Sequence, residues 1–261
     1  MAYSTISKPS LHFNTKLTTG TGNSQAVTGL GFQPDLIWGK RRDSTGNHSW
    51  FDAVRGITKG IESNSTGAEF TSTDYYSSFD SDGFTIASGS SGAGNGSSQT
   101  AAQWCWKANG QGSSNTDGSI NTTYTSVNTT SGFSICKWTG TGANGTIGHG
   151  LGAIPTVVIV KNLGATDNWV TYHKPLGATK YLKLNENSAE GTSSDVWNNT
   201  APTSSVFYVG SNTATNQSGN SMIAYCFAEK TGYSKFGSYT GNDNADGTFV
   251  YTGFKPAWII R

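Results

Sequence analysis

A short loop followed by an apolar run occurs three times along the chain. Each copy has one or two glycines, then a proline, then several apolar residues, and the copies lie at 29–38, 150–160 and 251–260. Glycine allows the backbone angles of a tight turn, and proline suits the first residue of a strand, where its missing N–H costs least. Short runs rich in β-branched and aromatic residues are typical of buried strands. The pattern therefore predicts a turn and a core strand at each position.

The repetition extends well beyond these loops. Pro34 and Pro155 are 121 positions apart, and the same offset aligns many other identical or similar residues. The clearest pairs are Lys40 with Lys161, Gly56 with Gly177, Asn64 with Asn185, Glu69 with Glu190, and Cys105 with Cys226. So many matches at one offset predict an internal duplication.

The next interval is shorter, because Pro155 and Pro256 are only 101 positions apart. The difference falls in 109–131, a stretch of Gly, Ser, Thr and Asn with few apolar residues. This composition predicts a linker or an edge strand. The second junction, at 229–236, is short and predicts a tight joint.

The apolar runs within the repeats predict the same order of strands in both copies. Turn-forming clusters separate the runs, and no long stretch has a 3.6-residue apolar period. We expect an all-β fold of two tandem antiparallel β-sandwich modules, of the jelly-roll or concanavalin-like kind, plus the start of a third. The predicted strands lie at 36–38, 49–51, 83–86 and 101–106 in the first module, and at 157–160, 169–172, 181–184, 206–209 and 222–227 in the second.

These patterns divide the chain into five predicted parts. They are an N-terminal attachment segment (1–14), a first sandwich (15–108), the linker or edge strand (109–131), a second sandwich (132–230) and a partial third repeat (231–261). A lone hairpin cannot bury itself in water. The partial repeat therefore predicts either that the chain is the ordered part of a longer protein, which we favour, or that its last strands pack on the second module or on a neighbouring subunit.

Composition narrows the class of protein. Charged residues make up 13% of the chain and the net charge is +1, which argues against nucleic-acid or membrane-surface binding, since both need a basic excess. The N-terminus lacks the apolar core of a signal peptide, and no run approaches the length of a membrane span. Three cysteines cannot form a disulfide framework. We expect synthesis in a cytoplasm, with reduced thiols.

The residues that bear chemistry do not form catalytic or metal-binding patterns. His12, His48, His149 and His173 share no ligand spacing, which predicts surface or capping roles, and Cys105, Cys136 and Cys226 lie in apolar strands typical of a core. The acidic turns at 80–83 and 243–247 lack the spacing of a calcium loop. We expect no metal and no cofactor.

Glycoside hydrolysis needs two carboxylates that face each other across a cleft. Glu69 and Glu190 are repeat equivalents, so they predict a shared structural feature and not such a pair. The chain also has no nucleophile elbow and no phosphate-binding glycine loop. We therefore expect that the protein is not an enzyme.

Eight tryptophans in a β protein of low charge suggest sugar binding, because aromatic faces stack on sugar rings. Most of the tryptophans lie within the strand runs and are expected in the core. Trp197 lies in a turn-rich segment instead, followed by Asn198 and Asn199. These three residues are the predicted carbohydrate-binding site.

Several segments resemble virion proteins of marine tailed phages, including cyanophages. The resemblance rests on the opening residues 1–14 and on the motifs at 31–38, 51–56, 78–85, 148–152 and 168–174. It covers nearly the whole chain. It implies a virion structural protein built from tandem lectin-like sandwich repeats, in a fibre or a particle-surface appendage, and such proteins usually continue beyond the point where this sequence ends. It brings no catalytic residues.

Repeats and resemblance together predict a phage appendage protein that is made in the host cytoplasm and assembled into the virion. We expect attachment to other tail or capsid proteins through Tyr3, Ile6, Lys8, Pro9 and Phe13, and adhesion of the modules to a host-surface glycan, where repeated weak sites would gain avidity. A symmetric oligomer is expected, a homotrimer in the case of a fibre. The alternatives are a capsid-decorating head protein without host contact and, second, a polysaccharide-degrading enzyme. Nucleic-acid binding and membrane insertion are not expected.

Overall fold

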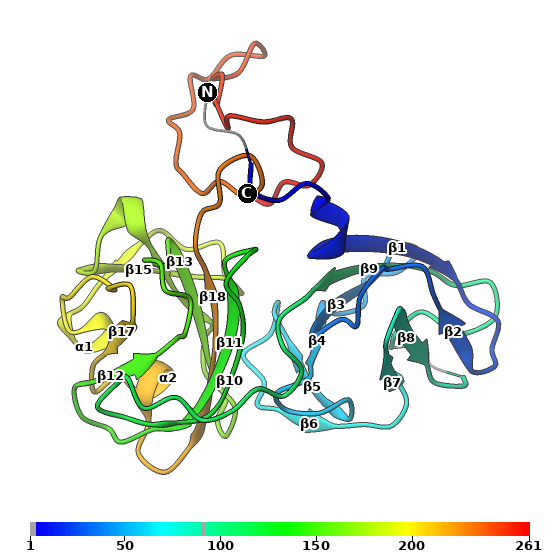
Figure 1. The fold of residues 1–261 in the computed structure, drawn as a ribbon, viewed down its shortest axis with the longest axis horizontal. Coiled ribbons are helices and arrows are strands. Elements are labelled where there is room, and N and C mark those ends of the chain that lie inside the picture. The colour runs from blue at the N-terminus through cyan, green and yellow to red at the C-terminus, as the bar shows by residue number, and fades with distance from the viewer. Residues whose placement is uncertain (1–3, 90–91) are drawn as a thin grey trace.

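The computed structural model describes residues 4–89 and 92–261, and the regular secondary structure in these residues is almost entirely antiparallel strand (Figure 1). The prediction of an all-β fold of antiparallel sheets is confirmed. Helical structure in the described residues is limited to four short elements. These are η1 (Pro9–Leu11), η2 (Lys174–Leu176), α1 (Ser194–Trp197) and α2 (Thr213–Asn216).

The first module consists of a six-stranded sheet and a three-stranded sheet. The large sheet has the order β1 (Phe13–Thr19), β9 (Thr100–Trp106), β3 (Leu36–Arg41), β4 (Ser49–Asp52), β5 (Lys59–Glu62), β6 (Phe70–Thr71). The small sheet has the order β2 (Gln25–Val27), β8 (Gly83–Ile86), β7 (Tyr76–Asp80). Strand β1 begins at Phe13, two residues before the predicted start of this module.

The second module has the same order of strands in its large sheet. Strands β11, β18, β13, β14, β15 and β16 follow one another as β1, β9, β3, β4, β5 and β6 do in the first. Their bounds are β11 (Phe133–Thr139), β18 (Ser221–Phe227), β13 (Val157–Asn162), β14 (Val170–His173), β15 (Lys180–Lys183) and β16 (Gly191–Thr192). Strands β12 (Gly145–Gly148) and β17 (Val206–Val209) form the small sheet.

The stretch between the modules contributes one further strand. Strand β10 (Thr122–Asn128) pairs with β11 at the edge of the second large sheet, which has seven strands as a result. The start of the stretch is fixed to the first module, because the buried carboxylate of Asp35 accepts hydrogen bonds from the amides of Ala108 (2.6 Å) and Gly110 (3.1 Å).

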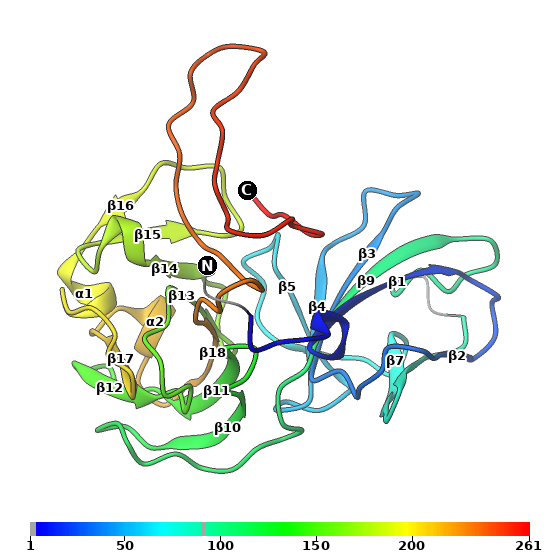
Figure 2. The ribbon, with the colours of Figure 1, turned by 45° about the horizontal axis from the view of Figure 1, so that its top comes forward.

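Side chains alternate between two cores along the strands of each large sheet. In β3 and β4, Ile37 and Phe51 face the first module's own core, whereas Leu36 and Trp50 face the second module. Strand β13 alternates in the same way. The two large sheets therefore face each other through their outer faces (Figures 1 and 2). A third core lies between the modules.

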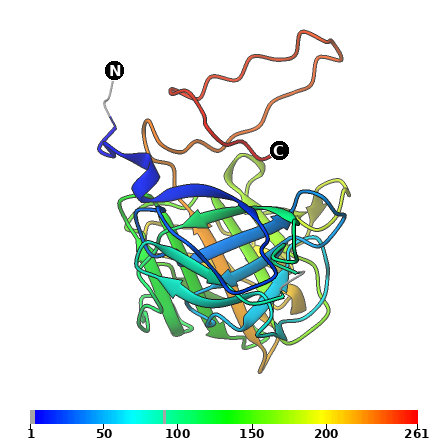
Figure 3. The same cartoon turned by 90° about the vertical axis from the view of Figure 1, so that its right-hand side faces the viewer.

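Residues 229–261 form no named strand in the described structure and make a long loop that projects from the two modules (Figures 1 and 3). Phe236 and Trp258 pack at its base, against the core between the modules. The two ends of the described chain lie close together. His12 is 6.2 Å from Tyr233 and Phe13 is 5.4 Å from Trp258, measured between ring centroids. The N-terminal segment therefore lies beside the partial third repeat.

Candidate functional site

The core between the modules contains a cluster of aromatic rings around Trp50. This side chain is 2% exposed and projects from β4 toward the second module. Its ring packs edge-on against Tyr225 (4.8 Å between centroids) and Trp169 (5.2 Å), both from the second module. Edge-to-face aromatic pairs add about 0.5–1.5 kcal/mol each beyond the area that they bury. The cluster therefore joins the two modules directly.

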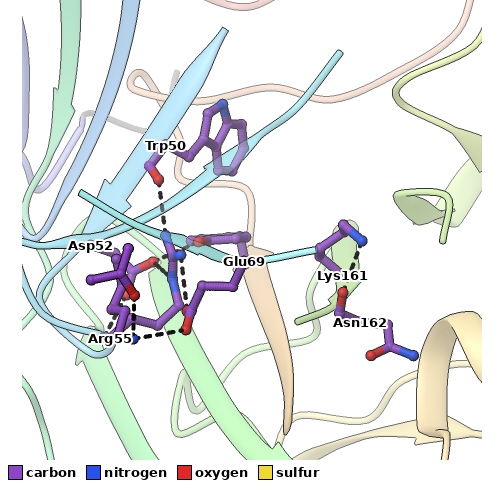
Figure 4. A network of polar contacts seen from close by, with 9 residues as sticks. Trp50, Asp52, Arg55, Glu69, Lys161 and Asn162 are labelled. Carbon is purple, nitrogen blue, oxygen red and sulfur yellow. Dashed lines mark hydrogen bonds and ion pairs between the residues drawn. The ribbon is translucent and has the colours of Figure 1, made fainter. Parts of the chain in front are cut away.

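A buried ionic network lies beside these rings (Figure 4). Strand β4 ends at Asp52, and the following turn brings Arg55 back over the strand end, where its Nε donates to Asp52 Oδ2 (2.6 Å). The other guanidinium nitrogens donate to the Trp50 carbonyl (3.0 Å) and to Glu69 Oε2 (3.3 Å). The hydroxyl of Tyr225 donates to the same Asp52 oxygen across the interface (2.7 Å). One carboxylate is thus bound by groups from both modules.

Arg55 and Tyr225 each keep one protonation state over the ordinary pH range. Burial alone would lower the pKa of Arg55, but the carboxylates of Asp52 and Glu69 raise it above its usual value. Burial raises the pKa of the Tyr225 hydroxyl well above its ordinary value. The guanidinium therefore stays charged and the phenol stays a neutral donor. A group that neither titrates near neutral pH nor meets solvent suits a structural joint better than acid–base catalysis.

The loop 62–69 of the first module is bound by the second module at several points. The indole N–H of Trp169 donates to the carbonyls of Glu62 (3.0 Å) and Ser65 (3.1 Å). Two main-chain hydrogen bonds also connect the modules, each 2.9 Å long. The Glu69 amide of the first module donates to the Leu163 carbonyl, and the Asp167 amide of the second module donates to the Thr66 carbonyl. These bonds satisfy polar groups that would otherwise be buried without partners.

Lys161 contributes to the interface between the modules from the second module's side (Figure 4). Its side chain is buried, and its ammonium donates to the carbonyls of Asn162 (2.8 Å), Ala165 (3.2 Å) and Thr66 (3.3 Å). Its repeat equivalent, Lys40, likewise donates to two carbonyls, those of Arg41 (2.7 Å) and Ser44 (2.8 Å). Binding the carbonyls of the following turn is thus common to both modules, and the bond to Thr66 is specific to the interface.

We expect the burial of Lys161 to appear as a pH dependence of stability. Burial lowers the pKa of Lys161 from 10.5 to about 8, although the charge of Asp167 opposes this effect. Between these values the unfolded chain binds more protons than the folded one, so the free energy of unfolding should rise as the pH increases from about 8 toward 10. Urea unfolding at several pH values would measure this rise.

Two matched variants test this prediction. In Lys161→Met the rise in the free energy of unfolding between about pH 8 and pH 10 should disappear, whereas in Lys40→Met it should remain. Both remove one lysine that binds turn carbonyls, and only the first changes the interface. Parallel pH profiles for the original chain and Lys161→Met would contradict the prediction.

The predicted carbohydrate-binding residue Trp197 is not on the surface. Helix α1 begins after Ser193, whose hydroxyl accepts a hydrogen bond from the Asp195 amide (3.1 Å). It ends at Trp197, before Asn198, which has a left-handed backbone (φ 50°). This short helix turns the indole into the second module's core, where it is 2% exposed and packs against Tyr172. The expectation that Trp197 stacks on a sugar is therefore wrong. Asn199 is exposed, and Asn198 accepts a hydrogen bond from Asn144 (2.8 Å).

The predicted attachment residues are spread over different environments. Tyr3 lies outside the described residues, and Lys8 and Pro9 are exposed. Ile6 is buried, and Phe13 is half-buried against Trp106 (4.7 Å between centroids). Of the described attachment residues, only Lys8 and Pro9 have the exposure that contact with another protein needs.

The other residues considered from the sequence lie apart from one another. All three cysteines are buried, and His149 is buried as a cap, with its Nδ1 accepting the Leu151 amide (3.1 Å). Glu69 pairs with Arg55, whereas Glu190 pairs with Lys180. Over residues 4–89 and 92–261, no group of three or more His, Cys, Asp or Glu side chains is placed to hold a metal ion.

The ionic network was not predicted from the sequence, although a signal for it was present. The repeat equivalents of Asp52 and Arg55 are His173 and Leu176, and that of Tyr225 is Trp104. Charged residues that lie beside an apolar strand in one copy and are replaced in the other indicate a role that the module itself does not need. Here that role is contact between the copies.

Comparison with known proteins gives a family but no characterised relative. No curated protein and no solved structure matches the chain. Within the described part of the chain, no helix is long and apolar enough to cross a membrane. Residues 8–261 match the model of a family described as a domain of unknown function (DUF7483). The match covers nearly the whole sequence, and the chain therefore belongs to this family.

Proposed function

We propose that this protein is a structural component of a phage particle, a fibre or surface appendage whose modules take part in adhesion to the host. The observation that carries the structural part is the joint between the modules, in which two large sheets pack face to face around buried Arg55. Relative motion of neighbouring domains is the default unless their interface is large and hydrophobic. This interface contains a cluster of buried apolar and aromatic residues from both modules and is crossed by bonded polar groups.

A rigid pair of modules suits an appendage. Binding sites that are held in a fixed geometry can contact the host surface at the same time, and avidity then strengthens sites that are weak individually. The pairing of the carboxylates also favours a non-catalytic role, because Glu69 and Glu190 are each bound to a cation of their own module. Adhesion would use exposed polar loops, since Trp197 is buried.

Location on the particle tests this proposal. Mass spectrometry of purified particles of the phage that carries this gene should find the chain as a particle protein, and immunogold labelling should place it on fibres or outer appendages. The lysate supernatant after the particles are removed serves as the control fraction. Labelling confined to the capsid would support a head-decoration role instead. A chain found only in the supernatant would contradict the structural role altogether.

A further inference from the structure

His12 connects three segments that are far apart in the sequence. It is the last residue before β1, and its carbonyl accepts a hydrogen bond from the Lys107 amide, which follows β9 (2.9 Å). The ring Nδ1 lies 3.1 Å from the side-chain nitrogen of Asn128, the last residue of β10. The ring also packs edge-on against Tyr233 (6.2 Å between centroids). His12 therefore holds the N-terminal segment to β10 and to the base of the C-terminal loop.

The ring of His12 is an addition to a main-chain contact that both modules share. Gly132 precedes β11 as His12 precedes β1. The Gly132 carbonyl accepts a hydrogen bond from the Ala228 amide, which follows β18 (2.7 Å). Because a glycine serves at this position in the second module, a module does not need an imidazole there to form this contact. The His12 side chain thus acts between segments rather than within the module.

The partners of Asn128 decide which atom of the His12 ring accepts a hydrogen bond. Asn128 Oδ1 accepts from the Ser131 amide (3.1 Å), and Asn128 Nδ2 donates to the Lys107 carbonyl (3.2 Å). A main-chain N–H can only donate and a carbonyl can only accept, so reversing the Asn128 side chain would break both bonds. Nδ2 is therefore also the donor to His12, and the ring Nδ1 is the acceptor. An imidazolium has a proton on both nitrogens and cannot accept, so this contact requires the neutral ring.

The groups that face the ring also oppose a positive charge on it. Burial and the ammonium of Lys107 both lower the pKa of His12 from its ordinary value of 6.5. The C-terminal loop presents the phenol of Tyr233, whose pKa burial raises, so it stays neutral. Strand β10 presents the neutral amide of Asn128. A released N-terminal segment would have a histidine of ordinary pKa, so below pH 6.5 the open form binds more protons than the closed form, and acid favours opening.

We propose that His12 is a pH-sensitive latch, which holds residues 4–12 against β10 and Tyr233 at neutral pH and releases them in acid. Protonation turns the hydrogen bond between Asn128 and the ring into a contact between two donors. It also places a second positive charge beside Lys107. Both effects act on the closed form alone, so they shift the equilibrium toward the open form.

Release of the N-terminal segment would change the surface without unfolding the modules. Ile6, which is 6% exposed in the closed form, would meet solvent, and so would the edge of the Tyr233 ring that His12 covers. Strand β1 would stay paired with β9 along its whole length. This inference goes beyond the proposed function and does not depend on a role in a phage particle.

Hydrogen exchange of the 261-residue chain at about pH 7.5 and about pH 5, corrected for intrinsic exchange rates, tests the latch. Protection of the amides in 4–12 should fall at the lower pH, by up to about thirtyfold. This limit follows from linkage for a histidine that titrates near 6.5 in the open form and stays neutral in the closed form. The amides of β1 should keep their protection, because the opening is local.

Two matched variants test whether His12 is the group that titrates. His12→Asn can present an amide oxygen to Asn128 and cannot be protonated, so residues 4–12 should stay protected at about pH 5. The control is His48→Asn, because His48 Nδ1 also accepts a hydrogen bond, from Trp38 (3.0 Å), and burial also lowers its pKa. This variant should lose protection in acid as the original chain does.

An NMR titration of the original chain tests the latch without any variant. The His12 ring should titrate below its ordinary value of 6.5, and the signals of the Asn128 side-chain amide and the Tyr233 ring should shift with the same midpoint. A His12 ring that titrates at or above 6.5 would overturn the proposal. Unchanged protection of residues 4–12 in acid, or an equal loss in His12→Asn and the original chain, would overturn it as well.

Discussion

Replacing Arg55 by methionine is expected to lower the free energy of unfolding by about 3–5 kcal/mol, the usual cost of breaking a buried ion pair from one side. The side chains of Arg55 and Asp52 have no solvent exposure, and the guanidinium is the cation that Asp52 contacts. Methionine fills much of the same volume without the charge. The variant would therefore keep a carboxylate buried between two sheets with the Tyr225 hydroxyl as its remaining side-chain donor.

Urea unfolding of the original chain and three variants would measure this effect. Arg41→Met removes an arginine from a solvent-accessible pair with Asp43 (3.1 Å) and should cost less than about 1 kcal/mol. The double variant Asp52→Asn with Arg55→Met should recover part of the loss, because the unpaired charge is gone. If Arg55→Met costs no more than Arg41→Met, the network does not stabilise the joint.

The architecture of the modules was largely predictable because it is local and repeated. Gly-rich loops, prolines and apolar runs recur at a fixed offset, and each run predicts one strand. In the first module the prediction missed β1, β2, β5, β6 and β7. Of these, β5 has a counterpart, β15, that the prediction found at nearly the right place. The run Tyr181-Leu182-Lys183-Leu184 alternates visibly, whereas Lys59-Gly60-Ile61-Glu62 has one large apolar residue. In β5 the packing of the whole sheet, rather than local propensity, decides the conformation.

The joint between the modules was harder to predict because its residues are distant in sequence. Asp52 and Tyr225 are 173 positions apart, and no local pattern connects them. A weaker signal did exist in the strands themselves. Residues 157–160 are apolar on both faces, and 104–106 place two tryptophans on one face with a cysteine between them. Strands that are apolar on both faces are buried on both faces, so each large sheet needed a second covering layer.

The burial of Trp197 could not be predicted for a different reason, which is that local backbone geometry sets the direction of its side chain. A tryptophan in a turn-rich segment suggests an exposed ring, but its direction depends on the cap at Ser193 and on the left-handed backbone at Asn198. Neither is visible in composition or periodicity. Side chains in short irregular helices are therefore poor candidates for a binding site when only the sequence is known.

Replacing Trp50 by alanine is expected to cost about 3–5 kcal/mol and to loosen the contact between the modules before either module unfolds. The side chain is 2% exposed and its ring bridges Trp169 and Tyr225. Its loss leaves a cavity between two sheets, each of which keeps its own core. The amides of Glu69 and Asp167, which donate across the interface, should then exchange with solvent through a local opening.

The matched control is Trp138→Ala, which removes an equally large and fully buried ring from the second module's own core. We expect a similar loss of global stability, but the amides of Glu69 and Asp167 should then exchange only with global unfolding. Native-state hydrogen exchange of the two variants at matched stability measures the difference. Equal protection of these two amides in both variants would mean that the interface and the module cores form one cooperative unit, and that Trp50 stabilises the whole protein rather than the joint.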